Sequence, residues 1–284
     1  MENPSILPKQ YGVEILRSEV GSTLHGISIG NDDRDEMGIC IENPEYVIGL
    51  EHFEQYLYRS AAARESRHDA PSQPGDLDLV VYSLRKWCRL ALKANPSVLL
   101  LLFVPDSKLV VSTPLGKELQ ALAPAFLSRK AAGAFLGYLQ AQKARFLRER
   151  GTAKIPDRGD KDRKYLAHVL RLGYQGVELL ETGRIKLPML EPQRQMCIQT
   201  RLGEINAQEI LTVVGRMERE LMDLRDSSFL PNEPDVSAVS NFLIQAYEKT
   251  WKSHHTPIFE STRRAADGIG RRDEENELHY KEVT

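Results

Sequence analysis

Cysteine is scarce in this chain of 284 residues, and its cysteines are isolated. There are three, an odd number, at Cys40, Cys88 and Cys197, and no two of them form a C-x-x-C pair. A disulfide scaffold and a zinc site built from cysteine alone are therefore not expected. The pattern favours small buried thiols in a reducing compartment.

Long apolar runs and a strong excess of one charge are also missing. The longest apolar run, Val98 to Val104, is far too short to span a bilayer, and the N-terminus MENPSILPKQYG lacks a basic-then-apolar signal segment. The net charge of −2 excludes a surface that is basic overall, so any surface for nucleic acid has to be local. We expect a cytoplasmic protein with no membrane partner.

The residue patterns divide the chain into an α/β N-terminal part and an all-helical C-terminal part. Residues 77–82 alternate apolar and polar with period two, which predicts a strand, and Ser83 then suits the cap of a helix over 84–92. Beyond residue 115, helical periodicity covers residues 117–122, 128–150, 161–182, 206–226 and 236–253. The predicted domains are 1–115 and 116–253, followed by a flexible polar tail, 254–284.

One stretch, GSTLHGISIGNDDRDEMGI over residues 21–39, crowds four acids beside a small-residue turn. Close carboxylates repel one another unless a cation offsets their charge. Asp33 and Asp35 are two apart, so on an extended chain both point to one face. A third acid from the strand at 77–82 would complete a site for divalent ions, and Asp78 is the candidate, with Asp76 farther out.

The Gly21-Ser22 pair at the start of this stretch suits phosphate groups. Glycine lets the backbone approach a ligand closely, exposed N–H groups in such a turn bind anions, and the Ser22 hydroxyl adds a donor. An acidic loop by itself is more often a solvated surface. The conjunction of Gly-Ser, Gly26, the Asp-x-Asp pair and a distant acid-bearing strand favours a nucleotide and metal site.

The same stretch resembles the Gly-Ser plus Asp-x-Asp signature of the DNA polymerase beta-type nucleotidyltransferase superfamily. Three further stretches resemble the RNA repair-associated family within it: DLVVYSLRKWCRLALKANPSVLLLLF, GYLQAQ and KYLAHVLRLGYQGVELLETGRIKLP. The resemblance covers residues 11–250. It implies a small mixed nucleotidyltransferase sheet flanked by helices, followed by a helical domain. It also implies metal-dependent transfer of a nucleoside monophosphate from a nucleoside triphosphate (NTP), which makes residues 1–115 the catalytic domain.

The resemblance carries specific roles onto specific residues. Asp33, Asp35 and Asp78 become the catalytic carboxylates and the ligands of Mg²⁺ or Mn²⁺, while Gly21 and Ser22 contact the triphosphate. Two positions depart from the family pattern. His25 replaces an aromatic residue, and it could bind a phosphate or sugar or merely pack. Glu36 replaces an apolar residue, and we expect it to face solvent. Neither change removes a predicted metal ligand.

Basic residues elsewhere are candidate phosphate partners. Arg85 and Lys86 begin the helix after Asp78 and could neutralise triphosphate charge, although a solvated first turn is an equally good interpretation. His168 and Arg171, three apart, share a helix face and could meet phosphate; a buried histidine with its hydrogen bonds satisfied fits the same spacing.

Residues 128–171 hold twelve Lys and Arg against four Asp and Glu, a local excess of eight positive charges. Such a region can attract a polyanion, so RNA is the expected acceptor. Two alternatives stay open at this stage: transfer of the nucleotide onto a protein hydroxyl, and a nucleotide-binding regulatory protein without catalysis. The presence of all three acids argues against the second alternative.

Overall fold

The computed structural model describes residues 5–30, 33–65, 73, 75–150 and 159–254. The chain forms two compact units, divided between residues 243 and 244. The predicted tail lies outside the described residues from position 255 onward. None of the helices in the described ranges is both long and apolar enough to cross a membrane.

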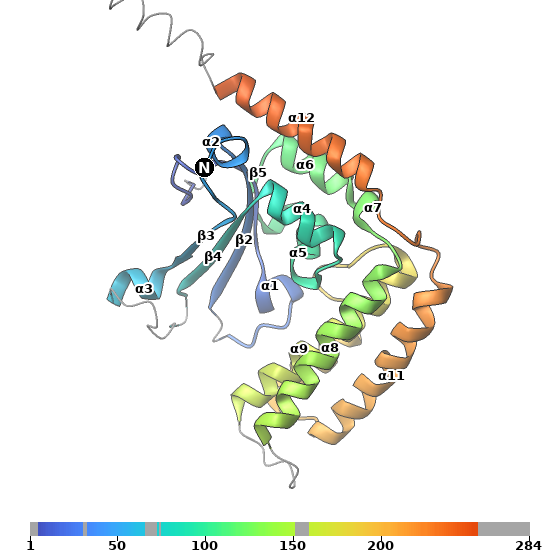
Figure 1. Cartoon of the computed structure of the whole chain (residues 1–284). Helices are drawn as coiled ribbons and strands as arrows, with labels where there is room; N and C mark the ends of the chain where they lie inside the picture. Colours follow the sequence, from blue (N-terminus) through green and yellow to red (C-terminus); the bar gives the residue numbers. More distant parts are fainter. Residues whose placement is uncertain (1–4, 31–32, 66–72, 74, 151–158, 255–284) are drawn as a thin grey trace, which may run out of the picture. The chain divides into compact units, whose positions relative to one another are not determined.

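The first unit contains a five-stranded mixed sheet with the order β3-β4-β2-β1-β5 (Figure 1). Its strands are β1 (Gly12–Glu19), β2 (Arg34–Glu42), β3 (Gln55–Arg59), β4 (Leu77–Ser83) and β5 (Leu109–Ser112). Only β2 and β4 pair in parallel; the other neighbours are antiparallel. The predicted α/β class is thereby confirmed. β1 ends two residues before Gly21.

Short helices connect and flank these strands. They are α1 (Gly21–His25), α2 (Pro44–Val47), α3 (Ser60–Glu65), α4 (Leu84–Leu92), α5 (Pro96–Leu99), η1 (Leu100–Leu102), η2 (Asp106–Lys108), α6 (Pro114–Ala121) and α7 (Ala123–Phe126). Ser83 caps α4 as predicted, because its Oγ accepts the Lys86 N–H. Asn95 likewise caps α5, because its side chain accepts the Ser97 N–H, and the apolar run that follows forms η1.

The helical part of the first unit is built around α9 (Asp160–Thr182). Its neighbours are α8 (Lys130–Arg150), α10 (Gln193–Leu202) and α11 (Ala207–Ser227), and all three pack against it. A Cβ on Gly173 would lie 2.6 Å from the Met217 side chain, and one on Gly176 would lie 2.9 Å from Phe135. Glycine at these two positions therefore lets α11 and α8 approach α9 closely. These four helices confirm the helical C-terminal region that the sequence predicts.

Helix α12 (Val236–His254) begins in the first unit and continues into the second, which starts at Ile244. Within the second unit, the Tyr247 and Trp251 rings lie 5.0 Å apart, one helical turn from each other.

The alternation of side chains along β2 gives the sheet two chemically different faces. Asp35 and every second residue after it point to one face, while Glu36, Gly38 and Cys40 point to the other. Glu36 does not face solvent as expected: it is buried, and its carboxylate pairs with Arg34 and, at 3.5 Å, with the buried Nε of Arg17. The expectation was wrong because the face of β2 that carries Glu36 is covered, and the buried carboxylate is offset there by the charges of Arg17 and Arg34.

All three cysteines are buried and free, in agreement with the sequence. Burial raises the pKa of both Cys88 and Cys197 to about 12, so these thiols stay protonated.

Candidate active site

The Gly-Ser turn is pressed against the second aspartate of the Asp-x-Asp pair. Gly21 has φ +66°, and a Cβ placed on it would lie 2.3 Å from Oδ2 of Asp35. The Val20 N–H donates to the Asp35 carbonyl at 2.8 Å, which ties the end of β1 to the beginning of β2. Glycine is thus required here both for its backbone conformation and for the space that the carboxylate occupies.

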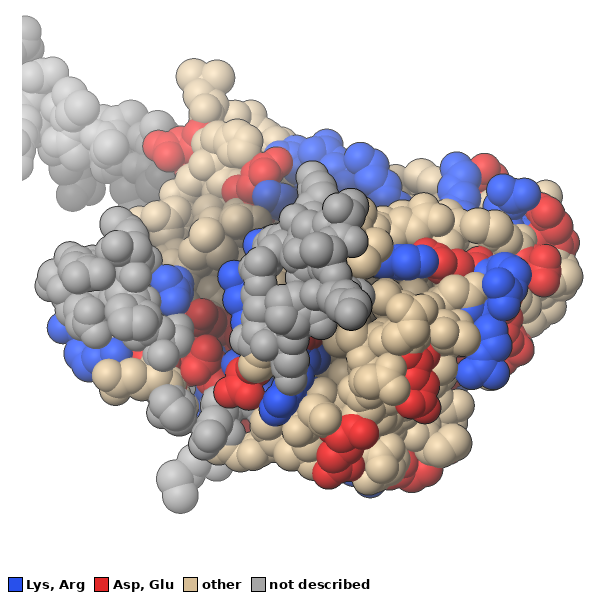
Figure 2. Space-filling view, turned by 90° about the horizontal axis from the view of Figure 1, so that it is seen from below, with Lys and Arg blue, Asp and Glu red and all other residues tan. Residues whose placement is uncertain are grey.

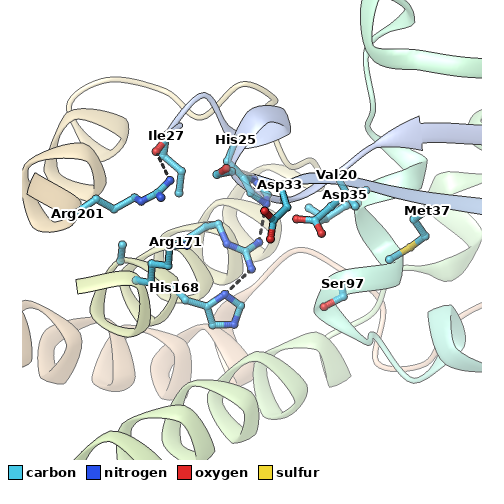
Figure 3. Close-up of a pocket in the computed structure, with 15 residues that line it drawn as sticks. Val20, His25, Ile27, Asp33, Asp35, Met37, Ser97, His168, Arg171 and Arg201 are labelled. Carbon is cyan, nitrogen blue, oxygen red and sulfur yellow. Dashed lines mark hydrogen bonds between the residues drawn. The ribbon is translucent and has the colours of Figure 1, made fainter. Parts of the chain in front are cut away.

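A cavity of about 370 Å³ opens beside this turn (Figure 3). One wall comes from the N-terminal part: Val20, Gly21, Ser22, His25, Ile27, Asp33, Asp35 and Met37. The other walls come from Ser97 and Leu100 and, in the helical part, from Lys164, Ala167, His168, Arg171 and Arg201. Five of the predicted site residues therefore meet in one cavity: Gly21, Ser22, His25, Asp33 and Asp35. His168 and Arg171 join them.

Asp78 takes the position opposite Asp35 in the parallel β2–β4 ladder, so both side chains start from the same face of the sheet. The Asp78 carboxylate does not line the cavity; its Oδ1 accepts a hydrogen bond from Arg59 Nε at 3.2 Å. Within the described residues, no three His, Cys, Asp or Glu side chains gather closely enough to hold a metal ion. The structure thus brings two of the three predicted carboxylates together, while Arg59 holds the third.

Asp76, the less favoured acid of the same strand region, has a structural role. Its carboxylate accepts hydrogen bonds from Arg64 Nη1 at 2.6 Å, the Gln73 N–H at 2.7 Å and the Ser60 hydroxyl at 2.9 Å. These contacts, led by the one from Arg64, lower its pKa to about 2. Asp76 fastens the beginning of β4 to α3.

Arg85 and Lys86 lie away from the cavity that holds Asp35. They line a separate small hollow, where Lys86 Nζ donates to Glu54 Oε2 at 2.7 Å. The first turn of α4 therefore points to a different surface from the Gly-Ser turn. The cations that the cavity does contain come from helices far along the chain.

One of these cations, Arg171 on α9, is buried and faces His25 at the end of α1 (Figure 3). Its Nη1 donates to His25 Nε2 at 2.8 Å and to Gln175 Oε1 at 3.0 Å, while its Nη2 donates to His168 Nδ1 at 3.0 Å. The Gln175 amide nitrogen lies 3.1 Å from His25 Nδ1. A neutral imidazole accepts a hydrogen bond at only one of its two nitrogens. The charged guanidinium of Arg171 is a stronger donor than the Gln175 amide, so Nε2 is the nitrogen of His25 that accepts.

Burial and the positive charge of Arg171 keep both histidines neutral. Burial, followed by the charge of Arg171, lowers the pKa of His168 to about 3, and the same two causes hold the pKa of His25 well below its ordinary value. Burial also lowers the pKa of Arg171 itself to about 10, so the guanidinium remains charged at neutral pH. The cluster is one buried cation between two neutral rings.

Further contacts join the Gly-Ser segment to the helical part. Arg201 Nη1 donates to the Ile27 carbonyl at 2.8 Å, and the Met189 N–H donates to the His25 carbonyl at 3.1 Å. Sequence reasoning missed Lys164 and Arg201 as cavity residues. Helix α10, which carries Arg201, is short and polar and was not predicted; its only clear sequence signal is Gly203, the left-handed residue that ends it.

The nucleotidyltransferase class of protein is defined by a mixed sheet in which a Gly-Ser helix follows the first strand. The next strand carries the Asp-x-Asp pair and runs parallel to a second acid-bearing strand. The model of one family, RlaP, described as the RNA repair pathway DNA polymerase beta family, matches residues 6–244. The chain belongs to this family, which confirms the resemblance seen in the sequence. Membership supports a transferase of the polymerase beta type.

The fold was also compared with solved structures, and one similar structure is that of a nucleotidyltransferase-like protein from Exiguobacterium sibiricum 255-15. The two chains are 10% identical, the match covers 85% of this chain and 75% of that one, and the TM-score is 0.28. A similarity this low adds no weight to the assignment, which rests on the family match. Comparison with curated protein sequences gave no significant match.

Proposed function

We propose that this protein transfers a nucleoside monophosphate from an NTP to a hydroxyl group of an RNA acceptor and releases pyrophosphate. The observation that carries the proposal is the contact between the two halves of the signature. The Gly21 backbone lies directly against the Asp35 carboxylate, and both line the cavity that also contains Ser22 and Asp33. This contact supports the proposal, because a backbone turn suited to phosphate groups lies beside carboxylates in a cavity large enough for part of a nucleotide.

The proposed reaction is an in-line substitution at the α-phosphorus. A bond forms between the acceptor oxygen and the α-phosphorus, and the bond from that phosphorus to the oxygen bridging to the β-phosphate breaks. Gly21 and Ser22 orient the phosphates. Asp78, on the same face as Asp35, takes the proton of the acceptor hydroxyl once Arg59 releases its carboxylate. Positioning and electrostatic stabilisation supply most of the rate enhancement in reactions of this type.

Two of the three proposed ligands are available to a hard divalent cation such as Mg²⁺ or Mn²⁺. Asp33 and Asp35 offer carboxylate oxygens in one cavity, the donor type that Mg²⁺ prefers, whereas the carboxylate of Asp78 is held by Arg59. Asp33 and Asp35 would hold the ion, with Asp78 as the third ligand of the proposed two-metal site. When bound, such ions offset the triphosphate charge and make the acceptor hydroxyl easier to deprotonate.

The basic region of α8 and α9 supports an RNA acceptor, but only part of it is available. Lys143 is paired with Glu218 and Lys130 with Glu233, and Lys and Arg are interspersed with Asp and Glu across the face seen in Figure 2. Next to the candidate active site, however, a second hollow of about 280 Å³ is lined by Gln142, Lys161, Lys164, Tyr165 and His168. It shares Lys164 and His168 with the first cavity, so an acceptor bound there would reach the reacting phosphorus.

The test is incubation with each labelled NTP and Mg²⁺, with and without total RNA, followed by gels for RNA and for protein. Label that migrates with RNA in the wild type and disappears in Asp35→Asn supports the proposal. Asp223→Asn, an exposed position on α11, is the matched control and should keep full activity. Label on protein would replace RNA by a protein acceptor, and full labelling by Asp35→Asn would refute the assigned site.

A further inference from the structure

Arg171 is a buried cation whose hydrogen-bond partners are all neutral. Its guanidinium donates to His25, His168 and Gln175, and it forms no ion pair with an Asp or Glu of the described residues. A guanidinium has five N–H groups, so two of them remain after these three contacts. A structural arginine at this depth is normally paired with a carboxylate, because an unpaired buried charge is costly.

The position of this charge points to its missing partner. Arg171 lines the cavity that contains the Gly21-Ser22 turn, and its contact with His25 fixes it relative to the helix that this turn begins. Lys164 and Arg201 line the same cavity, so three cations there face the two carboxylates of Asp33 and Asp35. An anion that enters between Ser22 and α9 would supply the counter-charge that the protein does not.

We propose that Arg171, held in place by His25 and His168, binds a phosphate of the triphosphate tail from the side opposite the Gly-Ser turn. This inference rests on the proposed function, since it assigns the substrate group that the cavity of that function takes. It also explains the departure at position 25. A phenyl ring there could not accept a hydrogen bond from the guanidinium, whereas an imidazole nitrogen accepts one and orients it. His25 and His168 are thus positioning residues, and Arg171 is the group that touches the ligand.

The experiment measures binding without turnover, by calorimetry in EDTA, so that only the chain's own cations respond. The probes are ATP, inorganic tripolyphosphate and adenosine. Charge-assisted hydrogen bonds are strong enough that Arg171→Met should weaken ATP and tripolyphosphate by about 10- to 100-fold and leave adenosine unchanged. Arg219→Gln, at an exposed position on α11, is the control and should bind all three probes as the wild type does.

Two additions keep the result interpretable. Arg171→Lys keeps the charge but not the fork that reaches both rings, so it should bind tripolyphosphate with intermediate affinity even if the Met variant unfolds. A 5′-phosphorylated and a 5′-hydroxyl oligoribonucleotide, compared by fluorescence anisotropy, test the other source of phosphate. A loss confined to the phosphorylated oligonucleotide would assign Arg171 to the acceptor and overturn the proposal, as would unchanged tripolyphosphate binding in both variants.

Failure of this inference is separable from failure of the proposed function. If ATP binding depends on Arg171 but no transfer to RNA or protein is found, the inference stands and the transferase proposal fails. If labelled NTP is transferred but the Arg171 variants bind ATP as the wild type does, the transferase proposal stands and this inference fails.

Discussion

Replacing Gly21 by alanine tests whether the Gly-Ser turn and the proposed catalytic carboxylate of Asp35 act as one unit. The new Cβ would lie 2.3 Å from Asp35 Oδ2, roughly 1 Å short of the 3.4 Å at which ordinary van der Waals contact begins. The carboxylate, or the turn that carries Ser22, therefore has to move by about that amount. A misplacement of ~1 Å at a reacting centre can cost on the order of 100-fold in rate, so we expect kcat/KM to fall by about that factor.

The matched control is Gly30→Ala. Gly30 also has a positive φ, +100°, but a Cβ there meets nothing within 4 Å. Both variants carry the backbone strain of an L-residue at positive φ, about 1–2 kcal/mol for the left-handed region. Gly21→Ala adds the close contact with Asp35, so it should lose at least as much stability as Gly30→Ala in urea unfolding. Only Gly21→Ala should lose nucleotide transfer in the labelled-NTP assay. A folded Gly21→Ala protein with kcat/KM close to that of Gly30→Ala would refute the coupling between turn and carboxylate.

Three other predictions follow from the same structure. Glu36→Ala removes one of two carboxylates paired with the buried Arg17, while Glu14 remains at 3.6 Å, so it should lower the free energy of unfolding by about 1–3 kcal/mol in urea titrations; a loss under about 0.5 kcal/mol would show that this ion pair is not needed. The pKa of His168 is lowered to about 3, so the unfolded chain binds the proton more readily and stability falls as pH drops below about 6.5. Going from pH 7 to pH 5 should cost the wild type about 2 kcal/mol more than His168→Asn, and equal losses would contradict the burial of a neutral ring. Arg59→Ala frees the Asp78 carboxylate and should preserve transfer or increase it at low Mg²⁺, whereas Asp78→Ala should abolish transfer; loss of activity in Arg59→Ala would instead show that the ion pair itself is required.

The local parts of the site were readable because their signals lie within a few residues. Asp33 and Asp35 are two apart, so extended geometry predicts a shared face, and both line the cavity. Their proximity to Gly21 comes from the fold of the β1–β2 connection. The strand that carries Asp78 was predicted from its alternating pattern, and the ladder sets Asp78 opposite Asp35. Its engagement by Arg59 was not readable, because the pairing of β3 with β4 depends on long-range register.

The cations of the cavity, Lys164, Arg171 and Arg201, could not be assigned to it from local sequence signals. Arg85 and Lys86 follow Asp78 in the sequence, yet the direction of α4 carries them to another hollow. The sequence fits Arg171 equally well as a phosphate contact and as a neighbour of a buried histidine. In the structure Arg171 is buried and also lines the cavity. Arg201 has no local signal at all: it reaches Ile27 across 174 residues of sequence.

The sequence by itself determined the chemistry of the N-terminal wall, because the spacing of glycine and aspartate along a short segment already fixes which groups share a face. It also determined the division into an α/β part and a helical part, since hydrophobic periodicity is a local property. Only the tertiary structure decided which cations oppose those aspartates and that Glu36 is buried. Such outcomes depend on how remote helices and strands pack, and the energy of packing is a property of the whole folded chain rather than of any segment.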